Sequence, residues 1–228
     1  MILAIETSDI LCSIAFWDSG RTILEYNLEL PQQHATLVGS LVEQGFLFLS
    51  APERTRTYSR DDIALLAVSI GPGSFTGLRI GLSFAQGFCS IGRSGIVGVS
   101  NHQVLAAQRL KIAGALFTII EARRNEVYMA RHEIVSNTFT QIASHDIVSK
   151  SELVEMLPAG AQLVFSKDLK MDAEDLDNLR AKDIKIVDSA RFIASVLAGL
   201  AEEKQAIHGT DSPAEIEPLY IRPFAGAL

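Results

Sequence analysis

The sequence predicts a two-lobed α/β protein in which each lobe holds a mixed β-sheet covered by helices. Two observations predict this class. Short apolar or alternating runs and longer segments with helical spacing follow one another along the chain, and this succession begins again near residue 100. The length of 228 residues suits one large domain or two small ones. We therefore expect an N-terminal lobe at 1–99 and a C-terminal lobe at 100–228.

The first lobe should begin with three consecutive strands joined by tight polar turns, because turn residues at 6–9 and 18–20 separate three apolar or alternating runs. A helical pattern, a polar loop at 50–62 and a continuous apolar run come next. In chain order we expect strands at 2–5, 11–17 and 22–30, a helix at 33–49, a strand at 63–70, a helix at 74–90, a strand at 95–99 and a helix at 101–110.

The second lobe repeats this order in a weaker form. We expect strands at 115–121, 126–134 and 139–142, a helix at 151–157, a strand at 163–166, an acidic stretch at 168–183, a strand at 184–187 and a helix at 190–204. Ser189 should cap the last helix. The order β-β-β-α-β-α-β is that of a half-domain of the actin-like, sugar kinase and Hsp70 (ASKHA) superfamily, so we predict the two-lobed ASKHA fold.

Composition limits the classes of function. The formal net charge of −7 argues against a protein that binds nucleic acid by itself through its phosphates. Cys12 and Cys89 lie among apolar neighbours, as buried thiols do in a reducing compartment. The first residues lack the basic region of a signal peptide, and no apolar run reaches the ~18–20 residues of a membrane span. We expect a soluble, cytoplasmic protein without a membrane contact.

The segment from Gly71 to Gly81 joins the apolar run at 63–70 to the next helical pattern. A glycine turn that opens a helix is typical of phosphate binding, because backbone N–H groups and the helix dipole face the turn. The known fingerprints nevertheless fail: Leu78-Arg79 stands where one requires Lys, and Thr76 stands where another requires Gly. Ser74 is best explained as the helix N-cap.

Small residues on that helix form a stripe. Gly77, Gly81, Ala85 and Cys89 recur every fourth residue and share one face, which allows another element to approach closely. Inside a helix, each glycine lowers the stability by ~1 kcal/mol relative to Ala, so the two glycines of the stripe require a structural explanation. Packing inside the fold and packing against another chain are both consistent with the spacing.

Several strings resemble signatures of one bacterial family. They are Ile2-Leu-Ala-Ile-Glu-Thr-Ser8, Gly71-Pro-Gly-Ser-Phe-Thr-Gly-Leu-Arg-Ile-Gly81, Glu121-Ala-Arg-Arg-Asn-Glu-Val-Tyr128 and Glu217-Pro-Leu-Tyr-Ile-Arg222, with Gln33-His34 opening the first helix. These strings are similar to those of the TsaB (YeaZ) family, and the resemblance extends over nearly the whole chain.

The resemblance implies a non-catalytic subunit that is required for N6-threonylcarbamoyladenosine (t6A) at position 37 of tRNA. Family members pair with TsaD, the catalytic paralogue that transfers threonylcarbamoyl from threonylcarbamoyl-AMP, and with the ATPase TsaE. We expect contact with tRNA only through this complex, and a homodimer when the chain is alone. The expected interface lies on the helices at 33–49 and 74–90. Its residues are Leu37, Leu41, Ser74, Phe75, Gly77, Leu78, Arg79, Gly81, Leu82 and Ala85.

Two residue patterns of the wider superfamily bear on metal binding and on nucleotide binding. TsaD-type chains carry His-x-x-x-His, whereas His102 here has Gly98 and Ala106 at the paired positions. We therefore expect no metal site, no catalytic residue and no cofactor, and we expect His102 to be a surface or capping residue. Glu6-Thr7-Ser8 occupies the position of a superfamily phosphate turn. It is either a vestigial nucleotide turn or a plain turn with local hydrogen bonds.

Other functions remain possible at this stage. The first alternative is a stand-alone ASKHA-type ATPase or kinase, and the second is a peptidase. Arg79 either bonds a carboxylate of a partner or is solvated. Arg54, Arg56 and Arg60 either touch tRNA or simply solubilise the loop at 50–62, for which we predict only exposure.

Overall fold

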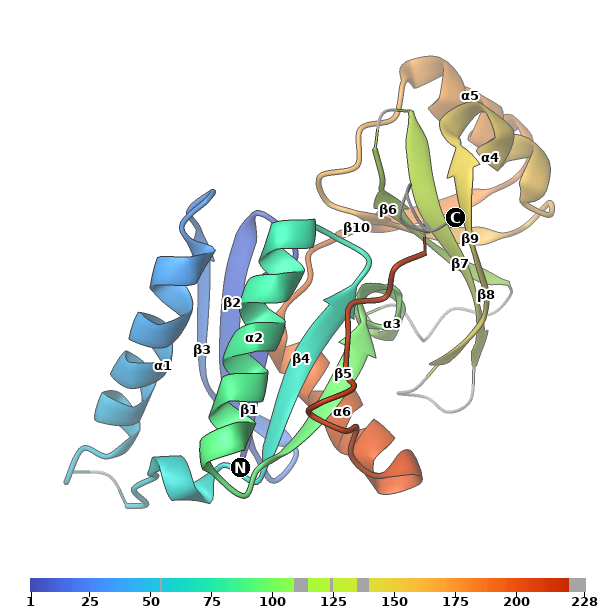
Figure 1. The fold of residues 1–228 in the computed structure, drawn as a ribbon. Coiled ribbons are helices and arrows are strands. Elements are labelled where there is room, and N and C mark those ends of the chain that lie inside the picture. Colours follow the sequence, from blue (N-terminus) through green and yellow to red (C-terminus); the bar gives the residue numbers. More distant parts are fainter. Residues whose placement is uncertain (54, 109–114, 124, 135–139, 222–228) are drawn as a thin grey trace, which may run out of the picture. The chain divides into compact units, whose positions relative to one another are not determined.

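The computed structural model describes residues 1–53, 55–108, 115–123, 125–134 and 140–221, which form two compact units (Figure 1). Unit 1 consists of Met1–Ser100 and Phe192–Pro218, and unit 2 is formed mainly by Asn101–Arg191. Unit 1 continues to Ser100, one residue past the boundary that we expected after residue 99. The predicted lobe 100–228 differs from unit 2, because the segment from Phe192 to Pro218 groups with unit 1.

Unit 1 contains a five-stranded mixed sheet. Its strands are β1 (Ile2–Glu6), β2 (Leu11–Asp18), β3 (Arg21–Glu29), β4 (Leu65–Gly71) and β5 (Gly95–Ser100), in the order β3-β2-β1-β4-β5. The first three strands are antiparallel neighbours, and β4 and β5 run parallel to β1. Ser19 and Gly20 both have positive φ, as the central residues of a tight hairpin turn require.

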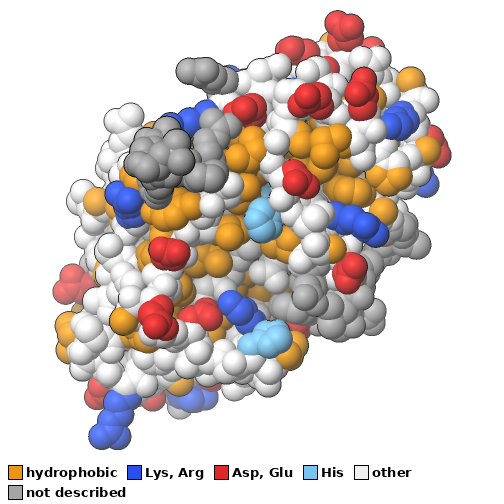
Figure 2. Space-filling view, turned by 45° about the vertical axis from the view of Figure 1, so that its right-hand side comes forward, with side chains coloured by type: hydrophobic (Ala, Val, Ile, Leu, Met, Phe, Trp, Pro, Cys, Tyr) orange, Lys and Arg blue, Asp and Glu red, His pale blue; other side chains and the backbone are white. Residues whose placement is uncertain are grey.

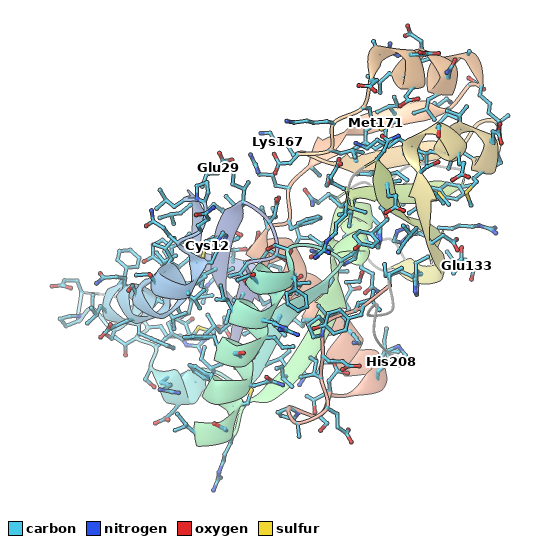
Figure 3. The ribbon with its side chains drawn as sticks, turned by 45° about the horizontal axis from the view of Figure 1, so that its top comes forward. Cys12, Glu29, Glu133, Lys167, Met171 and His208 are labelled. Carbon is cyan, nitrogen blue, oxygen red and sulfur yellow. The ribbon has the colours of Figure 1, made fainter. Side chains whose placement is uncertain are left out.

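Helices cover both faces of this sheet. Phe16 of β2 contacts Phe46 of α1 (His34–Leu49), with ring centroids 5.2 Å apart. The next residue, Trp17, donates a hydrogen bond of 3.1 Å to Glu202 of α6 (Ala194–His208). Because neighbouring residues of a strand point to opposite faces, α1 and α6 lie on opposite sides of the sheet. Helix α2 (Phe75–Ile91) packs beside α1. The core includes both thiols, and Figure 3 shows Cys12 on β2.

Unit 2 repeats the topology of unit 1. Its strands are β6 (Leu116–Glu121), β7 (Glu126–Ile134), β8 (Thr140–Ser149), β9 (Gln162–Ser166) and β10 (Lys185–Ala190), in the order β10-β9-β6-β7-β8. Each strand therefore takes the place of the strand five numbers earlier in unit 1. The helices are α3 (Asn101–Ala107), α4 (Lys150–Met156) and α5 (Ala173–Ala181). The predicted two-lobed ASKHA fold is confirmed, although β8 is longer than the strand expected at 139–142.

Helices α3 and α6 each pack on a sheet other than the one that contains the preceding strand of the chain. Helix α3 follows β5 in the chain but packs against β6, β8 and β9, whereas α6 follows β10 but packs on the sheet of unit 1. The backbone N–H groups of Ala194 and Ser195 donate to Ser13 Oγ at 2.8 Å and to Glu25 Oε1 at 2.9 Å. These bonds provide acceptors for two N–H groups in the first turn of α6, where the helix itself offers none.

The prediction that Ser189 caps this helix is wrong. Strand β10 continues to Ala190, so Ser189 is a strand residue, and α6 begins at Ala194 with Ile193 as its N-cap. No helix in the described parts of the chain has the length and apolar character to cross a membrane.

Candidate functional site

The glycine turn before α2 is filled by the protein's own β1–β2 turn. The N–H of Ser74 donates to the carbonyl oxygen of Ser8 at 2.7 Å, and a Cβ on Gly73 would lie 2.7 Å from the same oxygen. The Ser74 hydroxyl accepts from Gly77 N at 3.2 Å, which confirms the predicted N-cap. The donors at this helix start therefore bind the chain itself, so the turn is not built as an open phosphate cradle.

The small-residue face of α2 packs inside unit 1. A Cβ on Gly77 would lie 2.0 Å from the carbonyl oxygen of Thr7, and one on Gly81 would lie 2.5 Å from the Thr7 hydroxyl. Ala85 is fully buried, and Leu78 and Leu82 are each only 5% exposed. The prediction that these five residues meet a partner is therefore wrong, because the sheet of unit 1 already covers them.

The turn Glu6-Thr7-Ser8 makes the local hydrogen bonds of a structural turn. The N–H and the hydroxyl of Ser8 both donate to Glu6 Oε1. All three residues are buried. Burial raises the pKa of Glu6 from 4.5 to about 7, with the two bonds from Ser8 acting in the opposite direction.

His102 is buried, so the prediction of a surface or capping residue is wrong. Its Nδ1 lies 2.7 Å from Thr118 Oγ1, which lies 2.8 Å from Nε2 of His132. Burial lowers the pKa of His132 to about 4 and that of His102 well below 6.5. Both imidazoles are therefore neutral near pH 7. Within the described ranges, no three His, Cys, Asp or Glu side chains lie close enough together to hold a metal ion.

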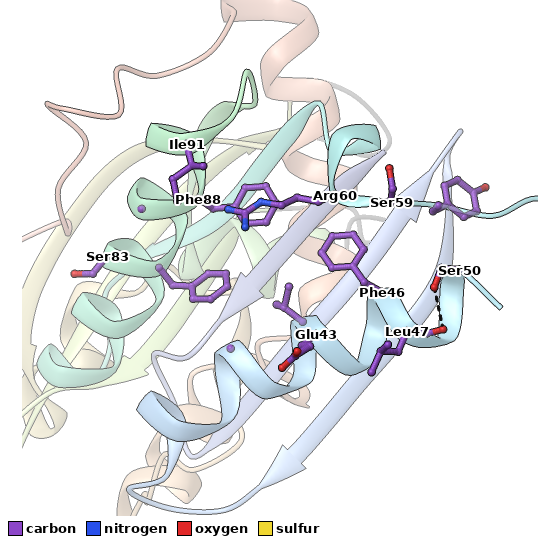
Figure 4. Close-up of a pocket in the computed structure, with 14 residues that line it drawn as sticks. Glu43, Phe46, Leu47, Ser50, Ser59, Arg60, Ser83, Phe88 and Ile91 are labelled. Atoms are coloured by element: carbon purple, nitrogen blue, oxygen red, sulfur yellow. Dashed lines mark hydrogen bonds between the residues drawn. The ribbon is translucent and has the colours of Figure 1, made fainter.

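The open surface of unit 1 lies between α1 and α2, beside the buried glycine face. A hollow of about 770 Å³ adjoins one of about 600 Å³, and both are lined by Ser83 and Phe84. We call this surface the α1–α2 groove (Figure 4). Its apolar walls come from Val42, Phe46, Leu47, Phe84, Phe88 and Ile91. Leu47 is 61% exposed and Ile91 is 77% exposed, so large apolar side chains face solvent here.

The structure places some of the predicted interface residues at this groove. Phe75 and Arg79 line it, and Ser74 is exposed at the start of α2. Leu37 and Leu41 are half-buried against the core. Sequence reasoning missed Phe84, Phe88 and Ile91, although their helical spacing beside the glycine stripe could have revealed a second apolar face.

Arginines stack on aromatic rings around the groove. The guanidinium carbon of Arg79 lies 3.7 Å from the centroid of the Phe75 ring, and that of Arg60 lies 4.3 Å from the centroid of Phe88. Figure 4 shows Arg60 reaching over Phe88. Arg56 pairs with Asp18 at 2.8 Å. Arg54 and Arg222, which the sequence patterns also included, lie outside the described residues.

Comparisons with known proteins agree with the sequence signatures. A family model described as TsaD, tRNA N6-adenosine threonylcarbamoyltransferase, matches residues 54–187, which is more than half of the chain. The tRNA threonylcarbamoyladenosine biosynthesis protein TsaB of Escherichia coli (strain K12) is 35% identical over 155 residues. That match covers 67% of this chain and 64% of the relative, so it spans slightly less than two thirds of that protein. TsaB of Bacillus subtilis (strain 168) is 28% identical over 231 residues, covering 97% and 93%.

Solved structures show the same fold. YeaZ from Pseudomonas aeruginosa has a TM-score of 0.73 at 22% identity, covering 96% of this chain and 98% of that one. A second structure is described as an uncharacterized protein from Pseudomonas aeruginosa with similarity to peptidase YEAZ. It has a TM-score of 0.76 at 21% identity, with 97% and 99% covered.

Proposed function

Because the chain belongs to the TsaB (YeaZ) family, we propose that it is a non-catalytic subunit required for t6A formation at position 37 of tRNA. In this proposal it docks on a TsaD-type catalytic subunit and supports the transfer of threonylcarbamoyl from threonylcarbamoyl-AMP. The names of its relatives connect the family with t6A biosynthesis. Since tRNA is the final substrate, the cytoplasm is the proposed site of action.

The α1–α2 groove is the observation that carries the docking role. Among the described residues, three of the exposed large apolar side chains line this groove, namely Leu47, Phe75 and Ile91. An apolar surface gathered on one pair of helices is typical of a protein interface. The groove therefore supports docking through this helix pair, with the interface shifted from the buried glycine face to the neighbouring one.

The same surface would serve other assemblies of the proposed complex. In the absence of TsaD, a homodimer would cover the apolar side chains of the groove. The ATPase TsaE would join the complex of the two paralogues.

The net charge of −7 and the acidic side chains over α5 support contact with tRNA through the complex only. Figure 2 shows several acidic side chains at the upper end of the face that it presents.

A reconstituted transfer assay tests this function. Purified TsaD, TsaE, threonylcarbamoyl-AMP and tRNA should form t6A only when this chain is added. Ser83→Arg places a long charged side chain in the groove at an exposed position, so it should abolish stimulation. Ser90→Arg is the matched control, because Ser90 is exposed on the same helix but does not line the groove. Full t6A formation without the chain would contradict the proposal, and so would threonylcarbamoyl transfer by the chain alone.

A further inference from the structure

We propose that residues 209–218 form a releasable strap over β5, the outer strand of the sheet of unit 1, and that Asp211 is the latch that keeps this strap closed. When the strap opens, the uncovered edge of β5 would pair with β5 of a second copy of this chain. The residues of the strap do not line the α1–α2 groove, so the inference does not depend on the proposed function.

Strand β5 has a neighbouring strand on one side only. It stands at the end of the order β3-β2-β1-β4-β5. The N–H of Gly95 donates to the carbonyl oxygen of Ala64 at 2.9 Å on the side of β4, and the backbone groups of alternate residues face opposite sides, so those of Ile96 and Gly98 face outward. An outer strand whose N–H and C=O groups are free is a template for pairing with another chain.

The strap and α6 occupy these outward groups. The N–H of Asp211 donates to the carbonyl oxygen of Ile96 at 2.8 Å, in an antiparallel bridge. The N–H of Gly98 donates to Asp211 Oδ2 at 2.8 Å, and Lys204 Nζ donates to the carbonyl oxygen of Gly98 at 2.8 Å. Figure 1 shows the strap, in dark red, crossing β5. Asp211 therefore takes the place of a neighbouring strand with one backbone group and one side chain.

Two glycines of β5 leave room for the strap. A Cβ on Gly95 would lie 2.5 Å from Thr210 Cγ2, and one on Gly98 would lie 2.9 Å from Ile216 Cδ1. Ile216 is half-buried and packs against the core of unit 1. The close approach at both glycines shows that the strap fits β5 along its length.

The strap is otherwise held at few points. The side chain of Gln86 on α2 donates to the carbonyl oxygens of Pro213 and Ile216 at 2.9 and 3.3 Å. Most residues of the strap are exposed. A segment with few buried apolar contacts opens at a lower free energy than the core of the protein. The strap can therefore leave β5 while the sheet of unit 1 stays folded.

Asp211 is the residue on which the closed strap depends most. Its N–H and its carboxylate make the bonds to β5, and the carboxylate also lies 3.3 Å from Lys204 Nζ. The side chains of Lys204 and Asp211 are 25% and 37% exposed, so salt should weaken this pair. Loss of the carboxylate takes the acceptor from Gly98 and the ion pair from Lys204 in one step.

The composition of β5 favours a second copy as the strand that would pair with the open edge. The segment Gly95-Ile-Val-Gly-Val-Ser100 contains no charged residue and no proline, and its branched side chains favour strands. Two such strands can pair antiparallel about a twofold axis, because each offers the same outward groups. The closed strap prevents this contact.

Amide hydrogen exchange, resolved by residue, tests the latch. Asp211→Ala should raise the exchange rates of the Gly98 amide and of the residue 211 amide about tenfold, because a hydrogen bond to a carboxylate is lost. The Val97 amide, which faces β4, should keep its rate. Asp211→Asn retains an oxygen acceptor and should lie between wild type and Asp211→Ala. Glu215→Ala is the matched control, because Glu215 is an exposed acid of the same strap whose side chain bonds to none of the described residues.

Sedimentation velocity tests the pairing of open edges. All chains would carry Ser83→Arg, so that the α1–α2 groove cannot form the dimer. Since both copies have to open, a tenfold rise in the open population should lower the apparent dissociation constant of the dimer about a hundredfold in Asp211→Ala. Glu215→Ala should leave this constant unchanged.

A disulfide that locks the strap provides the converse test. The Cβ position of Gly95 lies 3.4 Å from Cβ of Thr210, close to the ~3.5–4.5 Å of disulfides. Gly95→Cys with Thr210→Cys should therefore abolish the association of Asp211→Ala, and reduction should restore it. Cys89→Ser belongs in this background, because Cys89 Sγ lies 3.5 Å from the carbonyl oxygen of Gly95.

Each part of the inference has an outcome that would overturn it. Unchanged exchange at Gly98 and residue 211 would refute the latch. Equal acceleration at Val97 would refute a local opening, because the whole sheet would then unfold. An open chain that stays monomeric would exclude pairing of β5 strands, and so would association that persists in the locked chain. The transfer assay described above tests t6A formation separately from these measurements.

Discussion

The Thr7 hydroxyl donates a hydrogen bond of 2.8 Å to the carbonyl oxygen of Gly77, 70 residues further along the chain. This bond ties the β1–β2 turn to the first turn of α2. At this point the backbone of α2 approaches the backbone of the β1–β2 turn so closely that there is no room for a Cβ on Gly77. The two glycines of α2 that face Thr7 therefore serve the fold of unit 1, and the partner surface that we propose lies on a different face of the same helix.

Gly77→Ala should destabilise the protein. The new Cβ would lie 2.0 Å from the backbone oxygen of Thr7, so the turn or the helix has to move, at a cost of about 1–3 kcal/mol. Gly87→Ala is the matched control on the same helix, since nothing lies within 4 Å of its added Cβ. Ala is the better helix former by up to about 1 kcal/mol, so this control should be neutral or stabilising. Urea denaturation of both variants measures the difference, and equal stabilities would contradict the packing.

Glu6 should make unit 1 less stable as the pH rises from 4.5 towards 7. Its pKa is raised from 4.5 to about 7 in the folded state, so the folded chain holds a proton that the unfolded chain has released. The free energy of unfolding then falls by up to about 1.4 kcal/mol per pH unit in this window. Glu6→Gln should flatten this dependence, whereas the exposed control Glu53→Gln should not. A parallel pH profile for wild type and Glu6→Gln would refute the expectation.

His132 should give unit 2 the opposite dependence. Burial lowers its pKa from 6.5 to about 4, so below pH 6.5 the unfolded chain binds a proton that the folded chain does not. Stability is therefore lost as the pH falls from 6.5 to about 4, by up to about 1.4 kcal/mol per unit, and His102 adds to the loss. His132→Gln should reduce the slope.

His208 is the control for this measurement. It is exposed at the end of α6, as Figure 3 shows, and His208→Gln should leave the slope unchanged. Hydrogen exchange resolved by residue would assign the two opposite slopes to the two units. The same sign of slope in both units between pH 4.5 and 6.5 would disprove the assignment.

Removal of residues 192–228 should damage unit 1 more than unit 2, which loses only its C-terminal segment from Leu219 onward. The deletion removes α6, which binds Ser13 and Glu25 through its first turn and covers one face of the sheet. Trp17, the only tryptophan of the sequence, would lose its hydrogen bond to Glu202, and its emission should shift to the red. Removal of residues 219–228 alone keeps α6 and should leave the emission unchanged. An unshifted Trp17 signal after the longer deletion would show that α6 is dispensable for unit 1.

Local patterns predicted most of the elements. The first three strands, the turn at Ser19-Gly20 and the start of α2 at its Ser74 cap follow from alternation, turn chemistry and capping, which act within a few residues. The succession of strands in unit 2 was predicted from the repeat of the same order of elements. The role of the α1–α2 helix pair as an interface was predicted from family resemblance together with spacing, and it stays a prediction.

The remaining features depend on contacts between distant residues. Regular spacing showed that Gly77 and Gly81 needed a close neighbour, but it could not show that this neighbour was Thr7. The meeting of His102 with His132 depends on Thr118 between them and on the pairing of β6 with β7. Likewise, no local signal indicates that α6 joins a sheet formed about 170 residues earlier.

The packing of α6 on the sheet of unit 1, which lies far earlier in the chain, has a consequence for synthesis on the ribosome. The five strands of unit 1 are complete once Ser100 has been made, but one face of their sheet stays bare until α6 emerges at residues 194–208. Unit 2 needs only residues up to Arg191 from the main part of its chain. The sheet of unit 1, which is translated first, therefore keeps one apolar face exposed until most of the chain has been made.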